Sequence, residues 1–107
     1  KVLPHGDQRK LELGMILAPD PEVLLLDEPT AGMAAEQVPE LIHLIQEIKN
    51  NGNKTVILVE HNMNVVMSIS DTITVMNLGK KLAEGSPSEI TQNKEVQTAY
   101  LGGLYEL

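Results

Sequence analysis

The chain has 107 residues, with 8 basic and 15 acidic side chains, a formal net charge of −7 and no cysteine. These values exclude a disulfide scaffold and a cysteine-based zinc site, and they argue against a nucleic-acid-binding face. Hydrophobic residues make up 42% of the chain, too many for disorder, yet no apolar run approaches the roughly 18 residues that span a bilayer. We therefore expect one soluble, cytosolic globular domain with an aliphatic core.

The first predicted elements are a helix and a strand. Leu11, Met15 and Ala18 have helical spacing, which predicts a helix over residues 8–18 that Pro19 ends. Residues 23–26 read Val-Leu-Leu-Leu, a short apolar run that is typical of a strand buried on both faces of a parallel sheet.

A long amphipathic helix follows this strand. Pro39 fits only in the first turn of a helix, so the helix is expected to begin near Ala35 or Glu36. Residues 50–52, which read Asn-Asn-Gly, are expected to end it. The apolar stripe of this helix consists of Val38, Leu41, Ile42, Ile45 and Ile48.

A second core strand and a short helix come next. Thr55–Val59 is rich in β-branched residues and predicts the strand. Asn62 is suited to cap a short helix whose inner face consists of Met63, Val66 and Met67.

The last third of the chain predicts a hairpin and two short helices. Residues 73–84 have the pattern of a β-hairpin whose turn is Asn-Leu-Gly-Lys at residues 77–80. Ser86, beside Pro87, predicts a helix start, and residues 95–101 predict a final short helix. The alternation of strand and helix along the chain indicates an α/β fold with parallel pairing and right-handed crossovers.

Two carboxylates follow the first predicted strand. Asp27 and Glu28 stand at its carboxyl end, where α/β sheets bind their ligands. Hydrophobic runs that end in an acid are common, so this pattern alone also fits two solvated side chains. The surrounding motifs favour a ligand site.

Four motifs lie in order along the chain. Residues 3–9 read Leu-Pro-His-Gly-Asp-Gln-Arg, residues 27–33 read Asp-Glu-Pro-Thr-Ala-Gly-Met, and residues 59–61 read Val-Glu-His. Residues 74–80 and 83–87 belong to the predicted hairpin and the segment after it. In this order they resemble the signature, the Walker B motif with its D-loop, the switch histidine and the closing hairpin of ATPases of the ATP-binding cassette (ABC) family.

This resemblance implies an α/β fold, namely a partial P-loop NTPase fold with parallel core strands and helices, a C-terminal β-hairpin and short helices. Residues 1–107 would be the carboxyl-terminal half of the family's nucleotide-binding domain. The phosphate-binding motif of the Walker A half, Gly-x-x-x-x-Gly-Lys-Ser/Thr, occurs nowhere in the chain. We therefore expect that the chain alone neither binds ATP tightly nor hydrolyses it.

The resemblance also implies ATP and Mg²⁺ as cofactors and assigns roles to single residues. Asp27 would hold Mg²⁺ through a water, and Glu28 would act as the general base toward the attacking water. His61 would contact the γ-phosphate and keep the water in register with Glu28. The alternative for His61 is a histidine that only satisfies hydrogen bonds at a strand end.

The signature segment would contact the ATP held by the opposite subunit through Pro4, His5, Gly6 and Asp7. Here it departs from the family's usual Leu-Ser-Gly-Gly-Gln. Pro4 offers neither a hydroxyl nor an N–H, and Asp7 brings negative charge toward a phosphate. Gly6 keeps its amide, and the helix expected to start near Gln8 presents its positive end. We expect weaker ATP-driven closure of the dimer.

Residues 5–12, 30–33 and 96–102 most resemble the ATPases of branched-chain amino-acid importers. The implied function is part of the ATP-hydrolysing subunit that powers such an importer, in the cytoplasm and peripheral on the inner face of the membrane. The implied partners are a second ATPase subunit in a homo- or heterodimer, transmembrane permease subunits and, indirectly, a periplasmic or extracellular binding protein, but no nucleic acid.

Other functions fit part of the same pattern. The ATPases of urea importers and of lipopolysaccharide exporters share much of it, and an inactive fragment that serves only as a folding or interaction piece is a further alternative. A soluble ATPase of the same superfamily that acts in DNA repair or translation is disfavoured by the acidic charge.

The family's strand order makes one structural prediction, because the strand that leads into the phosphate cradle is missing. Residues 56–59 should pair with residues 24–26 on one side only, so that the other edge is open or occupied by another chain. We expect marginal stability of the chain alone, with self-association or a partner covering that edge. The alternative is direct pairing of residues 73–76 with residues 56–59.

Overall fold

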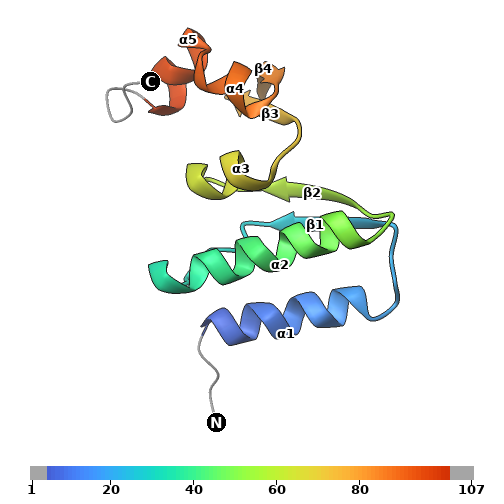
Figure 1. Cartoon of the computed structure of the whole chain (residues 1–107). Coiled ribbons are helices and arrows are strands. Elements are labelled where there is room, and N and C mark those ends of the chain that lie inside the picture. The colour runs from blue at the N-terminus through green and yellow to red at the C-terminus, as the bar shows by residue number, and fades with distance from the viewer. Residues whose placement is uncertain (1–4, 102–107) are drawn as a thin grey trace. The chain divides into compact units, whose positions relative to one another are not determined.

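The structure is a computed structural model in which residues 5–101 are described (Figure 1). The chain divides into two compact units, Lys1–Ile69 and Ser70–Leu107. Pro4 lies outside the described residues, and for His5 the backbone alone is described. Each unit has a small sheet of its own.

The first unit is built around a parallel pair of strands. β1 (Val23–Asp27) pairs with β2 (Thr55–Val59) over the full length of both strands. Within the described residues this sheet has two strands, and β2 carries no strand on its second edge. The predicted one-sided pairing is confirmed, and the alternative of direct pairing between residues 73–76 and β2 is wrong.

Three helices belong to the same unit, and two of them, α1 and α2, lie on one side of the strand pair (Figure 1). The helices are α1 (His5–Leu17), α2 (Val38–Asn51), which follows a 3-10 turn (η1, Ala35–Gln37), and α3 (Met63–Ile69).

Alternate residues of the strands face these helices. Leu24 and Leu26 of β1 are buried, whereas Leu25 is 69% exposed, and Ile57 of β2 is 52% exposed. The prediction of a strand buried on both faces is therefore wrong for this chain, because α1 and α2 both lie on one side of the strand pair and leave its other face exposed (Figure 1). The buried core consists of Leu13, Leu24, Leu26, Leu41, Ile45, Val65 and Ile69.

Helix α1 differs from its prediction in its start and in its inner face. It begins at His5 rather than at residue 8. Leu13 is buried, whereas Leu11 and Met15 are more than half exposed. Apolar residues lie on more than one face of this helix, so their spacing alone does not identify the face that contacts the core.

Helix α2 follows its prediction. The 3-10 turn begins at Ala35, Pro39 lies in the first turn of the helix, and Leu41 and Ile45 are buried. The chain leaves the helix at Gly52, whose φ of −140° is extended. This glycine therefore ends the helix without adopting the left-handed conformation that many helix ends require.

Helix α3 is capped as predicted. Oδ1 of Asn62 accepts hydrogen bonds from the backbone N–H groups of Asn64 (3.1 Å) and Val65 (3.4 Å), which satisfies donors that the helix itself leaves unpaired. Met63 and Met67 are half-buried rather than central to the inner face. The buried residues of the helix are Val65, Val66 and Ile69.

Two lysines connect elements of the first unit. Lys54 Nζ donates to Oδ1 of Asp20 and to the carbonyl of Pro21, each at 2.6 Å, and its hydrogen bond lowers the pKa of the Asp20 carboxyl. Lys10 of α1 contacts Glu40 of α2 at 2.5 Å and lowers the pKa of that carboxyl. Their stabilisation is present above the ordinary pKa of a carboxyl and is lost as the pH falls through the lowered values.

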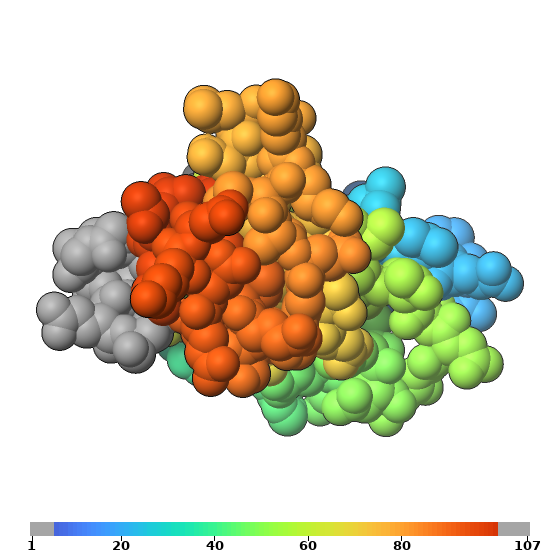
Figure 2. All heavy atoms as spheres, turned by 90° about the horizontal axis from the view of Figure 1, so that it is seen from above, coloured from blue at the N-terminus to red at the C-terminus, as the bar shows by residue number. Residues whose placement is uncertain are grey.

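The second unit begins with a hairpin. β3 (Ile73–Asn77) pairs antiparallel with β4 (Lys80–Gly85). The turn residues Leu78 and Gly79 both have positive φ, 50° and 78°, which is characteristic of a type I′ turn. In the space-filling view the tip of the hairpin, in yellow-orange, stands out from the rest of its unit (Figure 2). The predicted hairpin is confirmed.

Short helices follow the hairpin: α4 (Pro87–Thr91) and α5 (Lys94–Val96), which a π-type turn continues (η2, Gln97–Leu101). The Ser86 hydroxyl accepts from the Glu89 N–H at 3.2 Å, and the Glu89 carboxylate accepts from the Ser86 N–H at 3.0 Å. This reciprocal capping confirms the predicted helix start. No helix in the described part of the chain is long and apolar enough to cross a membrane.

The exposed apolar face of β1 and β2 generates a prediction about association. The unaltered chain should self-associate, and Ile57→Lys should weaken that association, because a lysine ammonium resists burial against a second apolar surface. Sedimentation velocity at equal concentrations measures the difference. Asn53→Lys, which adds the same charge at an exposed loop position, is the control. Equal association of the Ile57→Lys and unaltered chains would show that this face is not involved.

Leu78 generates a prediction about stability. Its side chain is 94% exposed, and its left-handed backbone costs a residue other than glycine about 1–2 kcal/mol, less for asparagine. Leu78→Asn should therefore raise the free energy of unfolding in urea by up to about 1 kcal/mol, and the β-branched Leu78→Val should lower it. A less stable Leu78→Asn chain would contradict this account of the turn.

Candidate functional site

The register of β1 and β2 brings two turns to the same edge of the sheet. Asp27 pairs with Val59 at the carboxyl end of the strands, and the backbone N–H of Glu28 donates to the Val59 carbonyl at 2.7 Å. Residues that follow the two strands are therefore neighbours although they are far apart in sequence. This edge is where α/β sheets bind their ligands.

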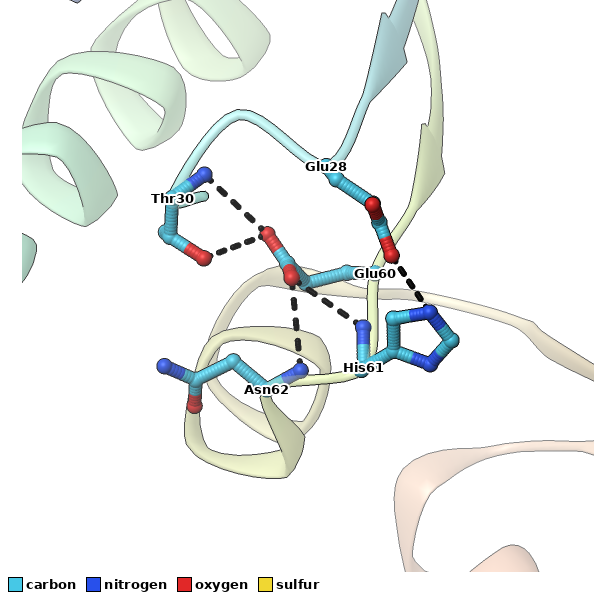
Figure 3. Close-up of polar contacts among 5 residues, drawn as sticks. All are labelled: Glu28, Thr30, Glu60, His61 and Asn62. Atoms are coloured by element: carbon cyan, nitrogen blue, oxygen red, sulfur yellow. Dashed lines mark hydrogen bonds and ion pairs between the residues drawn. The ribbon is translucent and has the colours of Figure 1, made fainter. Parts of the chain in front are cut away.

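The side chains of Glu28 and His61 meet at this edge (Figure 3). Oε1 of Glu28 contacts Nε2 of His61, and the two form an ion pair when the imidazole is protonated. The His61 side chain is 84% exposed and that of Glu28 is 38% exposed. The structure thus brings together the two residues that the sequence motifs single out for catalysis.

The backbone of Glu28 has a conformation that is uncommon for a residue with a side chain. Its φ is 47°, which costs on the order of 1–2 kcal/mol, and such residues cluster at functional sites. Two successive turns hold the segment: the Ala31 N–H donates to the Glu28 carbonyl and the Met33 N–H to the Thr30 carbonyl, each at 3.0 Å. The carboxylate of Glu28 is directed at the imidazole (Figure 3).

Asp27 is exposed and lines a groove of about 150 Å³ together with Arg9, Glu12 and apolar residues. The groove is smaller than the roughly 300–1,000 Å³ of small-molecule pockets, so it does not enclose a nucleotide. Among the described residues, no group of three His, Cys, Asp or Glu side chains could hold a metal ion. A single carboxylate still fits Mg²⁺, which proteins bind through one or two carboxylates, substrate phosphates and waters.

A third acid at this edge, Glu60, has no role assigned by the motifs. Its Oε2 accepts hydrogen bonds from Oγ1 of Thr30 at 2.8 Å and from the Thr30 N–H at 3.3 Å. Its Oε1 accepts from the backbone N–H groups of His61 (3.0 Å) and Asn62 (3.3 Å) (Figure 3). One sequence signal could have indicated it: Glu60 stands between the end of β2 and His61.

The signature segment is described in part. Gly6 is buried, and a Cβ there would lie 2.6 Å from the Gln37 side chain. Because α1 begins at His5 and not near Gln8, Asp7 lies exposed in the first helical turn. A carboxylate at this position interacts favourably with the helix dipole.

Arg9 connects this helix to the turn after β1. Its guanidinium donates to the carbonyl of Ala31 at 3.2 Å and contacts Glu12 of its own helix at 3.3 Å. Helix α1 is therefore joined by a hydrogen bond to the turn that carries Glu28.

Comparison with solved structures identifies the class of protein. The chain is similar to the ADP conformation of an ATP-binding cassette of an ABC transporter, with a TM-score of 0.81 and 28% identity over 94% of this chain and 41% of that chain. A dimeric, post-hydrolysis ATP-binding cassette bound to ADP and Pi gives a TM-score of 0.70 and 25% identity over 79% of this chain and 36% of that chain. The predicted fold class, part of the P-loop NTPase fold of ABC ATPases, is confirmed.

Comparison of sequences narrows the class to one branch. Residues 80–105 match the family model of the branched-chain amino acid ATP-binding cassette transporter. The chain is 49% identical over 100 residues to LivG of Salmonella typhimurium, a high-affinity branched-chain amino acid transport ATP-binding protein. That match covers 94% of this chain and 39% of LivG, so the chain spans well under half the length of this relative. The resemblance to ABC transporter ATPases of the branched-chain amino-acid branch is confirmed.

The exposure of the Glu28–His61 pair generates a prediction that tests the purely structural alternative for the histidine. His61→Ala should change the free energy of unfolding by no more than about 1 kcal/mol, because ion pairs between exposed groups contribute roughly 0–1 kcal/mol. Ile45→Ala, in the buried core, should cost about 2–5 kcal/mol and serves as the reference. Equal losses in chemical denaturation would mean that His61 supports the fold itself.

Proposed function

We propose that this chain forms part of the ATP-hydrolysing subunit that powers an ABC importer for branched-chain amino acids. One observation carries the proposal: Glu28 and His61 contact each other at the carboxyl edge of two parallel strands. The match of residues 80–105 to the branched-chain amino acid model supports this branch over the urea and lipopolysaccharide alternatives.

Glu28 is the proposed general base. Its carboxylate is partly exposed, and its one polar side-chain contact among the described residues is with His61. A carboxylate oxygen has room for several hydrogen bonds, so Glu28 can also accept one from a water and take its proton as that water attacks the γ-phosphate. A positioned base of this kind contributes typically about 10²–10⁴ in rate.

His61 is the proposed partner of this base. Its Nε2 contacts the Glu28 carboxylate, and an exposed imidazole can also donate a hydrogen bond to a phosphate oxygen. Such contacts would orient Glu28 and the attacking water with respect to the phosphate, which is the main task of an enzyme in phosphoryl transfer.

Asp27 is the proposed residue for Mg²⁺, which it would hold through a water. Its exposed position at the end of β1 suits an ion that is bound mainly by phosphates and waters. The bound ion would neutralise charge on the phosphates during transfer.

The signature segment, Pro4, His5, Gly6 and Asp7, is proposed to face the ATP of a second ATPase subunit. The amide of Gly6 and the positive end of α1 are the features that suit a phosphate. Residues 1–107 would then be the carboxyl-terminal half of the nucleotide-binding domain, and the rest of that domain would supply the phosphate cradle.

The proposed assembly is that of the transporter as a whole. The chain would act in the cytoplasm, peripheral on the inner face of the membrane through permease subunits, with a periplasmic or extracellular binding protein as an indirect partner. The second ATPase subunit, identical or not, would complete each ATP site.

Replacing Glu28 tests this proposal in the complete ATPase subunit that contains this sequence. Glu28→Gln should reduce turnover by about 10²–10⁴ and leave ATP binding within a few-fold, because the amide keeps the shape but does not accept a proton. Phosphate release and nucleotide titration measure the two effects. Glu22→Gln, an exposed position just before the opposite end of β1, is the matched control. Near-normal turnover of Glu28→Gln would exclude Glu28 as the base.

A further inference from the structure

The Glu60 carboxylate receives hydrogen bonds from both turns at the site (Figure 3). Its Oε2 accepts hydrogen bonds from the hydroxyl and the N–H of Thr30, in the turn after β1, at 2.8 and 3.3 Å. Its Oε1 accepts hydrogen bonds from the N–H groups of His61 and Asn62, in the turn after β2, at 3.0 and 3.3 Å. Each oxygen therefore binds one of the two turns.

We propose that Glu60 is a positioning residue: it fixes the turn that carries Glu28 against the turn that carries His61. This inference rests on the function proposed above for those two residues. It assigns Glu60 no contact with the substrate, and its effect on the reaction passes through the separation of Glu28 and His61.

All acceptor positions of the Glu60 carboxylate already have donors, which argues against a role as general base. An ionised carboxylate offers about four lone-pair directions, and Glu60 has four donors on them. It therefore has no acceptor position left for an attacking water. Glu28, with its one contact to His61, does.

The contact between Glu28 and His61 does not fix the two turns by itself. The imidazole is 84% exposed, so water competes with the contact and salt screens it. Glu60 is half-buried as a residue, and three of the four donors to its carboxylate are backbone N–H groups, which move only with the backbone. Hydrogen bonds to an ionised acceptor are the stronger kind. Glu60 is therefore the better determinant of the distance between the turns.

The backbone ladder ends just before this contact. The N–H of Glu28 donates to the carbonyl of Val59, and past that bond the side chains of Glu60 and Glu28 join the turns. The left-handed conformation of Glu28 lies between the ladder and Thr30. Loss of the Thr30–Glu60 bonds would thus leave the Glu28 turn joined to the His61 turn, past the ladder, only through the exposed Glu28–His61 contact.

Steady-state ATP hydrolysis by the complete ATPase subunit tests the proposal. Glu60→Gln should lower kcat roughly 10- to 100-fold, because a small displacement of catalytic groups is enough for such a loss. KM for ATP should stay within about 3-fold, because Glu60 contacts no nucleotide in this scheme. In Glu60→Gln the side-chain amide replaces one acceptor oxygen by an NH₂ donor. This donor faces the donors of one turn, so the hydrogen bonds to that turn are lost.

A second pair of variants covers the case in which Glu60→Gln does not fold. Thr30→Val removes the Oγ1 donor and keeps the shape, so kcat should fall roughly 3- to 10-fold with KM unchanged. Thr30→Ser keeps the hydroxyl and should therefore retain most of the unaltered kcat. Thr74→Val is the matched control: Thr74 Oγ1 also donates to a glutamate, Glu84, at 2.7 Å, but in the hairpin of the second unit. Its kcat should be unchanged.

The outcomes separate this inference from the proposed function. If Glu28→Gln remains active, the proposed function fails whatever Glu60 does. If Glu28→Gln is inactive while Thr30→Val and a folded Glu60→Gln keep the unaltered kcat, the positioning role alone is overturned. A rise in KM without a fall in kcat, or a Thr30→Ser variant as impaired as Thr30→Val, would overturn it as well.

Discussion

The parallel register between β1 and β2 is the constraint on which the site depends. Leu24 and Leu26 face the core while Leu25 faces out, and a slip of one residue would exchange these faces. The same register pairs Asp27 with Val59 and places Glu28 and His61 at one edge. Burial of aliphatic side chains in the core therefore determines which polar residues meet at the edge of the sheet.

The three acids at this edge differ in how many partners they have. Asp27 is exposed and has no polar side-chain partner among the described residues, Glu28 has one in His61, and the Glu60 carboxylate accepts four hydrogen bonds. A carboxylate without partners suits a hydrated cation, one with a single partner can still accept a proton, and one with four partners is structural. Glu28 and Glu60 are the same residue type, and their surroundings are what separates the roles proposed for them.

The sequence predicts those features that depend on local pattern. Both core strands, α2 with its start near Ala35, the Asn62 and Ser86 caps and the hairpin all follow from residue spacing and turn chemistry. The inner face of α1 does not, because both Leu11 and Leu13 are apolar and only packing selects Leu13.

The local sequence pattern also does not predict which side chains are buried or which partners they contact. A continuous apolar run such as residues 23–26 looks the same whether helices cover one face of the sheet or both. The sequence does predict that Asp27 and Glu28 lie at the end of a strand, and the order of the motifs indicates His61. The role proposed for Glu60 depends on Thr30, which is distant in sequence and comes close only through the register of the strands.

The conformation of Glu28 explains why so many contacts converge on the turn after β1. A left-handed backbone there costs on the order of 1–2 kcal/mol, and hydrogen bonds contribute roughly 0.5–1.5 kcal/mol each. The bond from Glu28 to Val59, the bond from Ala31 to Glu28 and the Thr30–Glu60 pair surround the strained residue, and Pro29 beside it is buried. Together these contacts can offset the strain without any contribution from the Glu28 carboxylate. The side chain of the proposed general base therefore has no structural task. Its contact with His61 can change when the carboxylate takes a proton from the attacking water, while the turn stays in place.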